Sequence, residues 1–149
     1  MDFPDNLTRT VLIDASVVDV WQVMTTPELV EQWISEGGVT VSSNYMVGSP
    51  ILFSGKVGSL KIRDKGTILV ADPGKRLSYN YWSRISRLKD IPENYVVVDL
   101  RLEVEGDGTR LTLSVTNIAE ITYKHWEFYW NVAVLMLKRV AETRVIIRP

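Results

Sequence analysis

The side chains best placed to do chemistry are the hydroxyls of three tyrosines and the ring of one histidine. Tyr79 and Tyr81 are two residues apart in an alternating stretch, and Tyr129 lies among the bulky aromatics near the end of the chain. Phenol hydroxyls at the polar ends of aromatic walls suit a ligand held by one or two hydrogen bonds. His125 is the sole histidine, so a multi-histidine metal site cannot form.

The sequence favours no other chemistry. It contains no cysteine, which excludes thiolate nucleophiles and cysteine-based metal sites. On a helical wheel His125 falls beside Val132 and Met136, away from the main aromatic arc, and this favours a surface position over the role of general base. Glu120 and Glu127 fall on a polar wedge and are explained by a solvated helix face. We therefore expect no catalytic residue, no metal and no cofactor.

Composition limits the class of protein and its partners. The 149 residues are 46% hydrophobic and 23% charged, which is typical of a globular protein and predicts a single domain over residues 1–149. A formal net charge of -1 gives no general attraction for nucleic acid or for an anionic membrane surface. The longest apolar run, Val132 to Leu137, is too short to span a bilayer. We expect a cytoplasmic protein with no nucleic-acid or membrane partner.

The last third of the chain predicts one long helix, from Glu120 to about Thr143, without proline or glycine. At 100° per residue its polar side chains fall in one narrow wedge and its bulky apolar side chains fill the opposite arc. The arc contains Trp126, Tyr129, Trp130, Ala133, Leu137 and Ala141. An amphipathic helix of about six turns needs a large apolar surface to pack against.

The rest of the chain supplies that surface as strands. A strand is expected at Thr8–Asp14, followed by two short helices that begin at Ser16 and at the cap and proline Thr26-Pro27. Alternating stretches then predict strands at Val39–Val41, Ile51–Phe53, Gly66–Ala71, Leu77–Trp82, Val96–Val104 and Leu111–Val115, and Leu60–Ile62 could form a further short segment. We predict an α+β fold in which a curved antiparallel sheet of about six or seven strands wraps around the terminal helix.

Residues 84–94 form a longer irregular segment that could be a flap. It carries Arg84, Arg87 and Lys89 around three apolar residues. The basic side chains could cover the mouth of a cavity and receive a carboxylate, but a solvated loop is the simpler explanation and is favoured.

Several short motifs resemble the START-like, helix-grip superfamily, in the branch related to the activator of the ninety-kilodalton heat-shock protein ATPase. The match covers nearly the whole chain. It rests on Ile13-Asp14-Ala15-Ser16 with Val20-Trp21, Thr26-Pro27-Glu28 with Trp33, Gly66-Thr67-Ile68, Asp72-Pro73-Gly74-Lys75-Arg76-Leu77 with Tyr79, Gly108-Thr109-Arg110-Leu111, and Trp130 with Leu137. The resemblance implies a sheet that grips the last helix, often with a hydrophobic pocket between them. Tyr129 stands where many relatives carry glycine, which should narrow or reshape that pocket.

These observations favour binding of a small hydrophobic or aromatic molecule between the sheet and the last helix. The residues expected to line the cavity are Trp33, Phe53, Tyr79, Tyr81, Val98, Leu113, Trp126, Tyr129, Trp130, Ala133 and Leu137, with Ser78 or Asn80 near the mouth. Two alternatives stay open. One is a cyclase-like or hydratase-like enzyme that uses the tyrosines and His125, and the other is a protein that contacts a chaperone.

A second apolar surface is expected on the same helix. Phe128, Val132 and Leu135 project away from the aromatic arc, and a helix gripped on one face does not need them there. They could pack under the two short helices, or they could form an exposed patch suited to a homodimer or to another protein.

Overall fold

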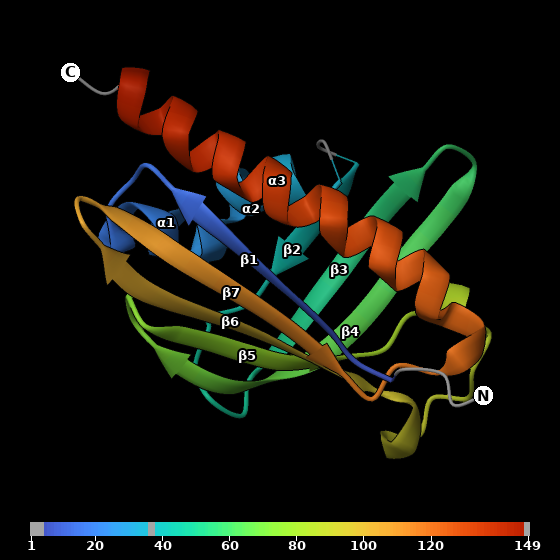
Figure 1. The fold of residues 1–149 in the computed structure, drawn as a ribbon. Helices are drawn as coiled ribbons and strands as arrows, with labels where there is room; N and C mark the ends of the chain where they lie inside the picture. Colours follow the sequence, from blue (N-terminus) through green and yellow to red (C-terminus); the bar gives the residue numbers. More distant parts are fainter. Residues whose placement is uncertain (1–4, 36–37, 148–149) are drawn as a thin grey trace.

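The computed structural model describes residues 5–35 and 38–147, and it contains one seven-stranded antiparallel sheet. The strand order is β1-β7-β6-β5-β4-β3-β2. The strands are β1 (Leu7–Ile13), β2 (Val39–Ser42), β3 (Pro50–Val57), β4 (Leu60–Asp72), β5 (Arg76–Tyr81), β6 (Val96–Glu105) and β7 (Gly108–Thr116). The sheet curves around the long terminal helix α3 (Tyr123–Ile147), which crosses one of its faces (Figure 1). The predicted α+β helix-grip architecture is confirmed.

Two short helices, α1 (Val17–Thr25) and α2 (Pro27–Ile34), follow β1 as predicted. The Ser16 hydroxyl accepts the amide of Asp19 and caps α1. Thr26 occupies the N-cap position of α2 as predicted, but its hydroxyl makes no capping hydrogen bond. Pro27 occupies the first turn of α2, where its missing N–H costs nothing. The terminal helix begins one turn later than predicted, because Glu120–Thr122 form a separate 3₁₀ turn, η3.

The middle of the sheet differs from the prediction at one point. Leu60–Ile62 and Gly66–Ala71 belong to a single strand of 13 residues, β4, which pairs with β3 on one side and with β5 on the other. Ile62, Asp64, Gly66 and Ile68 are buried while their neighbours in sequence are more exposed. The alternation therefore continues through the polar residues between the two predicted strands and places a carboxylate on the inner face.

The polar wedge of α3 lies along the edge strand β1. Lys138 Nζ donates to the Leu12 carbonyl at 2.7 Å, and the Glu142 carboxylate accepts the Asp14 amide at 2.8 Å and pairs with Lys138 at 2.7 Å. Near the start of the helix, Arg9 donates to Asn131. A sheet edge with free backbone groups invites pairing with another chain, and α3 covers this edge. The polar side chains of α3 thus anchor the helix to β1, and they are more than a solvated helix face.

Within the described residues, no helix is both long enough and apolar enough to cross a membrane.

Candidate functional site

The structure brings the predicted aromatic residues together in one continuous row between the sheet and α3. Ring centroids are separated by 5.1 Å for Phe53–Tyr81, 5.4 Å for Tyr81–Trp126, 5.8 Å for Trp126–Tyr129 and 5.1 Å for Tyr129–Trp130. The four pairs are close to perpendicular, the edge-to-face geometry that aromatic rings prefer. The rings therefore pack against one another and fill most of the space in which a central cavity was expected.

Two spaces lie beside this row of rings. Trp33, Phe53 and Tyr79 line a void of only about 10 Å³ beneath α2, which is too small for a ligand. Tyr81 and Trp126 line a larger pocket of about 90 Å³ at the open end of the sheet. The other six predicted residues line neither space and are packed into the interior: Val98, Leu113, Tyr129, Trp130, Ala133 and Leu137.

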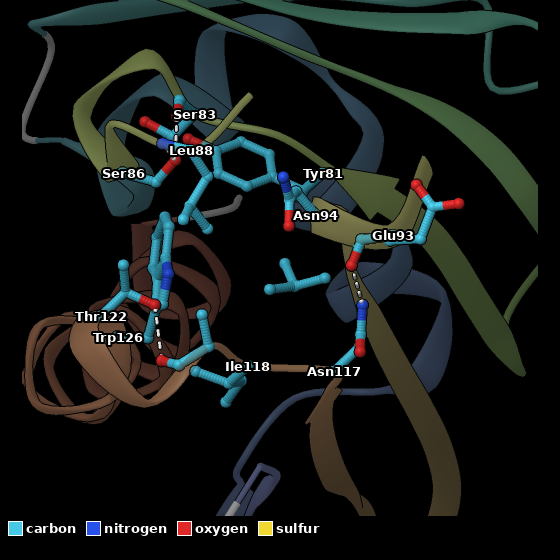
Figure 2. A pocket seen from close by; sticks show the side chains of 12 residues that line it. Tyr81, Ser83, Ser86, Leu88, Glu93, Asn94, Asn117, Ile118, Thr122 and Trp126 are labelled. Atoms are coloured by element: carbon cyan, nitrogen blue, oxygen red, sulfur yellow. Dashed lines mark hydrogen bonds between the residues drawn. The ribbon is translucent and has the colours of Figure 1, made fainter. Parts of the chain in front are cut away.

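Three segments of the chain form the walls of the larger pocket, hereafter the mouth pocket (Figure 2). The first is the flap of residues 83–94, with its two 3₁₀ turns η1 (Arg84–Ser86) and η2 (Pro92–Asn94). The second is the start of β6, and the third is the connection from β7 to α3. The lining residues are Tyr81, Ser83, Ser86, Leu88, Glu93, Asn94, Val96, Asn117, Ile118, Ala119, Thr122 and Trp126.

Hydrogen bonds and an ion pair hold the flap in place over the pocket. Lys65 Nζ lies 2.5 Å from the Asp90 carboxylate, and the Trp82 indole donates to the Leu88 carbonyl at 3.3 Å. On the opposite wall the Asn117 amide donates to the carbonyls of Glu93 and Tyr95 at 2.9 and 2.8 Å. The flap is thus tied to β4, to the end of β5 and to the β7–α3 connection.

The basic side chains of the flap do not take the role suggested by the sequence. Arg84, Arg87 and Lys89 are exposed and line neither space. Ser78 and Asn80 also differ from the prediction, because the Ser78 hydroxyl donates to the Val98 carbonyl and Asn80 accepts the Thr67 amide. Both polar groups make hydrogen bonds within the sheet and do not line the mouth pocket.

The structure adds a buried carboxylate behind the mouth pocket that sequence reasoning missed. Asp64 is 5% exposed, accepts the Tyr81 hydroxyl, and accepts the Arg84 amide at 3.4 Å. Burial raises the pKa of the Asp64 carboxyl, and hydrogen bonds from Tyr81, Ser83 and Arg84 and the charge of His125 oppose that shift without reversing it. Asp64 therefore joins the inner face of β4 to the first turn of the flap.

The tyrosines of the site can donate hydrogen bonds but are poor bases. Burial raises the pKa of Tyr79 and of Tyr81 well above the ordinary value, and the neighbouring Asp64 carboxyl adds to the effect on Tyr81. Burial also raises the pKa of Tyr129, whose hydroxyl donates to the Ile34 carbonyl at 3.0 Å. All three phenols stay protonated at neutral pH, which does not favour a mechanism in which a tyrosinate removes a proton.

His125 is exposed on α3, as its position on the helical wheel predicts, with its ring 4.9 Å from the Trp126 ring. It does not line the mouth pocket.

Asp64→Asn is expected to change how stability depends on pH. The pKa of Asp64 is higher in the folded protein than its value of 3.8 in an unfolded chain. Its contribution to folding stability is therefore fully present below pH 3.8 and is lost as the pH rises through the folded pKa. Asparagine cannot ionise, so the stability of the variant relative to the wild type should increase from about pH 4 to pH 7. Urea unfolding at several pH values measures the difference, with Asp107→Asn in an exposed turn as the control. A difference that stays constant or falls with pH would contradict this assignment.

The seven-stranded antiparallel sheet and the long C-terminal helix define a START-like, helix-grip protein, which is a ligand-binding fold. The family model "Activator of Hsp90 ATPase homolog 1-like protein" matches residues 14–142, and the chain belongs to this family. A search of curated proteins finds no match.

Solved structures agree with this assignment. A protein from Cytophaga hutchinsonii is 31% identical, with a TM-score of 0.78 over 97% of this chain and 99% of that one. An Aha1 protein from Colwellia psychrerythraea, described as a dimer, is 22% identical, with a TM-score of 0.72 over 92% and 96%. DynU16, from the dynemicin biosynthetic locus, is 21% identical, with a TM-score of 0.73 over 95% of this chain and 48% of that one.

Proposed function

We propose that the protein binds a small hydrophobic or aromatic molecule by taking one end of it into the mouth pocket. The observation that carries the proposal is the pocket of about 90 Å³ between the flap, the β7–α3 connection and the Tyr81–Trp126 pair. Its volume is far below the 300–1,000 Å³ of pockets that enclose a drug-sized ligand, so it suits part of a molecule.

The rim of the pocket supports an apolar ligand. Ile85 lies in η1, Ile91 precedes η2 and Ile121 lies in η3, and all three side chains are exposed. Each belongs to a segment that forms a wall of the pocket, so the outer part of a hydrophobic ligand has apolar surface on which to lie. The membership of a ligand-binding fold family is in accord with this proposal.

Ala119→Leu tests the proposal by filling the pocket. Ala119 lines the pocket and is only partly exposed, so three added carbons project into the free space. Native mass spectrometry of the purified wild type should show a co-purified small molecule, and the variant should lose at least about nine-tenths of it, since the pocket can no longer accept the ligand.

Ala71→Leu, a half-exposed position near the far end of β4, is the matched control and should keep the ligand. Two results together would refute the proposal. They are the absence of any bound species and the absence of any shift in Leu88 and Ile118 methyl resonances with a panel of ring-bearing ketones, phenols and hydrocarbons.

We also propose that the protein forms a homodimer through the outer face of α3. Phe128, Val132 and Leu135 are 74%, 45% and 59% exposed, and their spacing of four and three residues places them on one stripe. They do not pack under the two short helices, which was one of the two expectations from the sequence. A stripe of this kind on a helix can pair with its own copy about a two-fold axis, and the similar Aha1 protein is described as a dimer.

Leu135→Glu is expected to convert the dimer into a monomer, because the charge would be buried in the contact without a partner. Light scattering after gel filtration should give twice the 17.0 kDa chain mass for the wild type and the single-chain mass for the variant. Val104→Glu is the control, since Val104 is 71% exposed on the β6–β7 hairpin and lies outside the stripe. A wild type that is monomeric at about 100 μM would disprove the proposal.

A cytoplasmic location stays a prediction, and the absence of cysteine from the sequence supports it.

A further inference from the structure

The indole N–H of Trp126 is a hydrogen-bond donor without a partner at the wall of the mouth pocket. Trp126 is 7% exposed and makes ring contacts with three neighbours, but its nitrogen donates to no group in the part of the chain that the structure describes. Other tryptophans behave as expected of buried donors. Trp33 donates to the Val23 carbonyl at 3.0 Å, and Trp82 donates to the Leu88 carbonyl.

The position of this nitrogen distinguishes it from the unpaired indole of Trp130. The Trp130 nitrogen is also unpaired, but protein atoms seal it completely and Trp130 does not line the pocket. The Trp126 nitrogen is not sealed in this way, and Figure 2 shows the indole standing at one wall of the pocket, across from Asn117. A molecule that enters the pocket can therefore accept a hydrogen bond from this N–H group.

Most of the other side-chain donors of the pocket are hydrogen-bonded to the protein. Ser86 donates to the Ser83 carbonyl at 2.7 Å, and Thr122 donates to the Ala119 carbonyl at 2.9 Å. The Asn94 amide donates to the Lys89 carbonyl, and the Asn117 amide bridges two carbonyls of the flap. Asn94 keeps a second N–H, but Trp126 is the buried lining side chain whose single donor makes no hydrogen bond to the described part of the protein.

The charges of the pocket restrict the acceptor further. No lysine, arginine or histidine occurs among the lining residues, and Glu93 is the one lining residue that carries a charge at neutral pH. A carboxylate or phosphate would enter without a cation to balance it and would face a negative side chain. An uncharged acceptor avoids both costs.

We infer that the end of the ligand held in the mouth pocket is a neutral oxygen acceptor, such as a ketone, lactone or quinone carbonyl, which receives the Trp126 N–H. This rests on the proposed ligand-binding function and specifies the chemical class of the ligand. The apolar side chains of Leu88, Val96 and Ile118 then enclose the carbons next to that oxygen. The body of the molecule extends past the rim.

Two probes that differ only in this oxygen test the inference. 1-Indanone and indane share one bicyclic skeleton, and the first adds a ketone. Titrations followed by NMR should show 1-indanone binding about three- to tenfold more tightly than indane, the factor that one net hydrogen bond provides. The indole proton of Trp126 should move downfield with the ketone and stay in place with the hydrocarbon. In Trp126→Phe the preference for the ketone should disappear while indane binding is kept.

The possible results separate the inference from the function on which it rests. Two results would overturn the inference without affecting the proposal of binding at the pocket. One is equal affinity for the two probes, and the other is a Trp126 indole proton whose chemical shift does not change with the ketone. If neither probe shifts the methyl resonances of Leu88 and Ile118, the proposed function itself fails. The indole proton of the wild type tests the inference even if Trp126→Phe does not fold.

Discussion

Gly66→Ala is expected to lower the free energy of unfolding by about 3 kcal/mol, at the upper end of the range for overpacking. Gly66 lies on the inner face of β4, where a Cβ atom would stand 1.7 Å from the Asn80 carbonyl oxygen and 2.8 Å from its carbon. The atoms in the way are backbone, so no side-chain rotation relieves the clash. The two paired strands β4 and β5 would have to separate at this point.

Chemical denaturation measures the loss, and Gly74→Ala is the matched control. Gly74 has a φ of +76° and open space around the added carbon, so its substitution costs only the left-handed conformation, about 1–2 kcal/mol. Gly66→Ala should cost more than Gly74→Ala. It should also shift the resonances of Tyr81 and of the flap, because Asp64 is only two residues away and holds both. If Gly66→Ala loses less unfolding free energy than Gly74→Ala, then β4 and β5 do not approach each other closely at Gly66.

The architecture could be predicted from the sequence because the local signals agreed with one another. Alternation in Val96–Val104 and Leu111–Val115 identified the β6–β7 hairpin, and the unbroken 3.6-residue period from Trp126 to Leu137 identified α3. The join inside β4 was missed because Arg63, Asp64 and Lys65 interrupt the apolar alternation. Continuing the period of two through them would have placed Asp64 between Ile62 and Gly66 on the inner face.

The residues of the site were predicted less well, for a reason of packing. The periodicity of the sequence identifies which side chains face inward. All eleven side chains that were predicted to line the cavity pack in or against the core. It cannot state whether inward rings leave space or fill it, and here the edge-to-face row from Phe53 to Trp130 fills it. The walls of the mouth pocket come from irregular segments, residues 83–94 and 117–122, whose shape depends on hydrogen bonds between distant residues such as Asn117 and Glu93. No periodic signal marks such contacts.

Tyr129→Ala is expected to reopen the central cavity that the wild-type rings close. Tyr129 stands between Trp126 and Trp130 at the position where resemblance to the family implies glycine, and its hydroxyl satisfies the last carbonyl of α2. Removing the ring should lower the free energy of unfolding by about 3 kcal/mol, the lower end of the range for truncating a buried aromatic, because Tyr129 is only partly buried. Tyr129→Phe is the control and should cost about 1 kcal/mol, because it removes only the hydrogen bond to Ile34.

The space left by the ring gives this prediction a second, independent measurement. An apolar cavity of about 150 Å³ in a protein core stays dry and binds benzene, so benzene should raise the thermal midpoint of Tyr129→Ala through preferential binding to the folded state. The same benzene concentration should not raise the thermal midpoint of the wild type or of Tyr129→Phe, because neither has a central cavity. If Tyr129→Ala is destabilised but gains nothing from benzene, the sheet and α3 have collapsed into the gap. The size of the cavity would then depend on more than the ring at position 129, and the glycine of relatives would not by itself account for an open pocket.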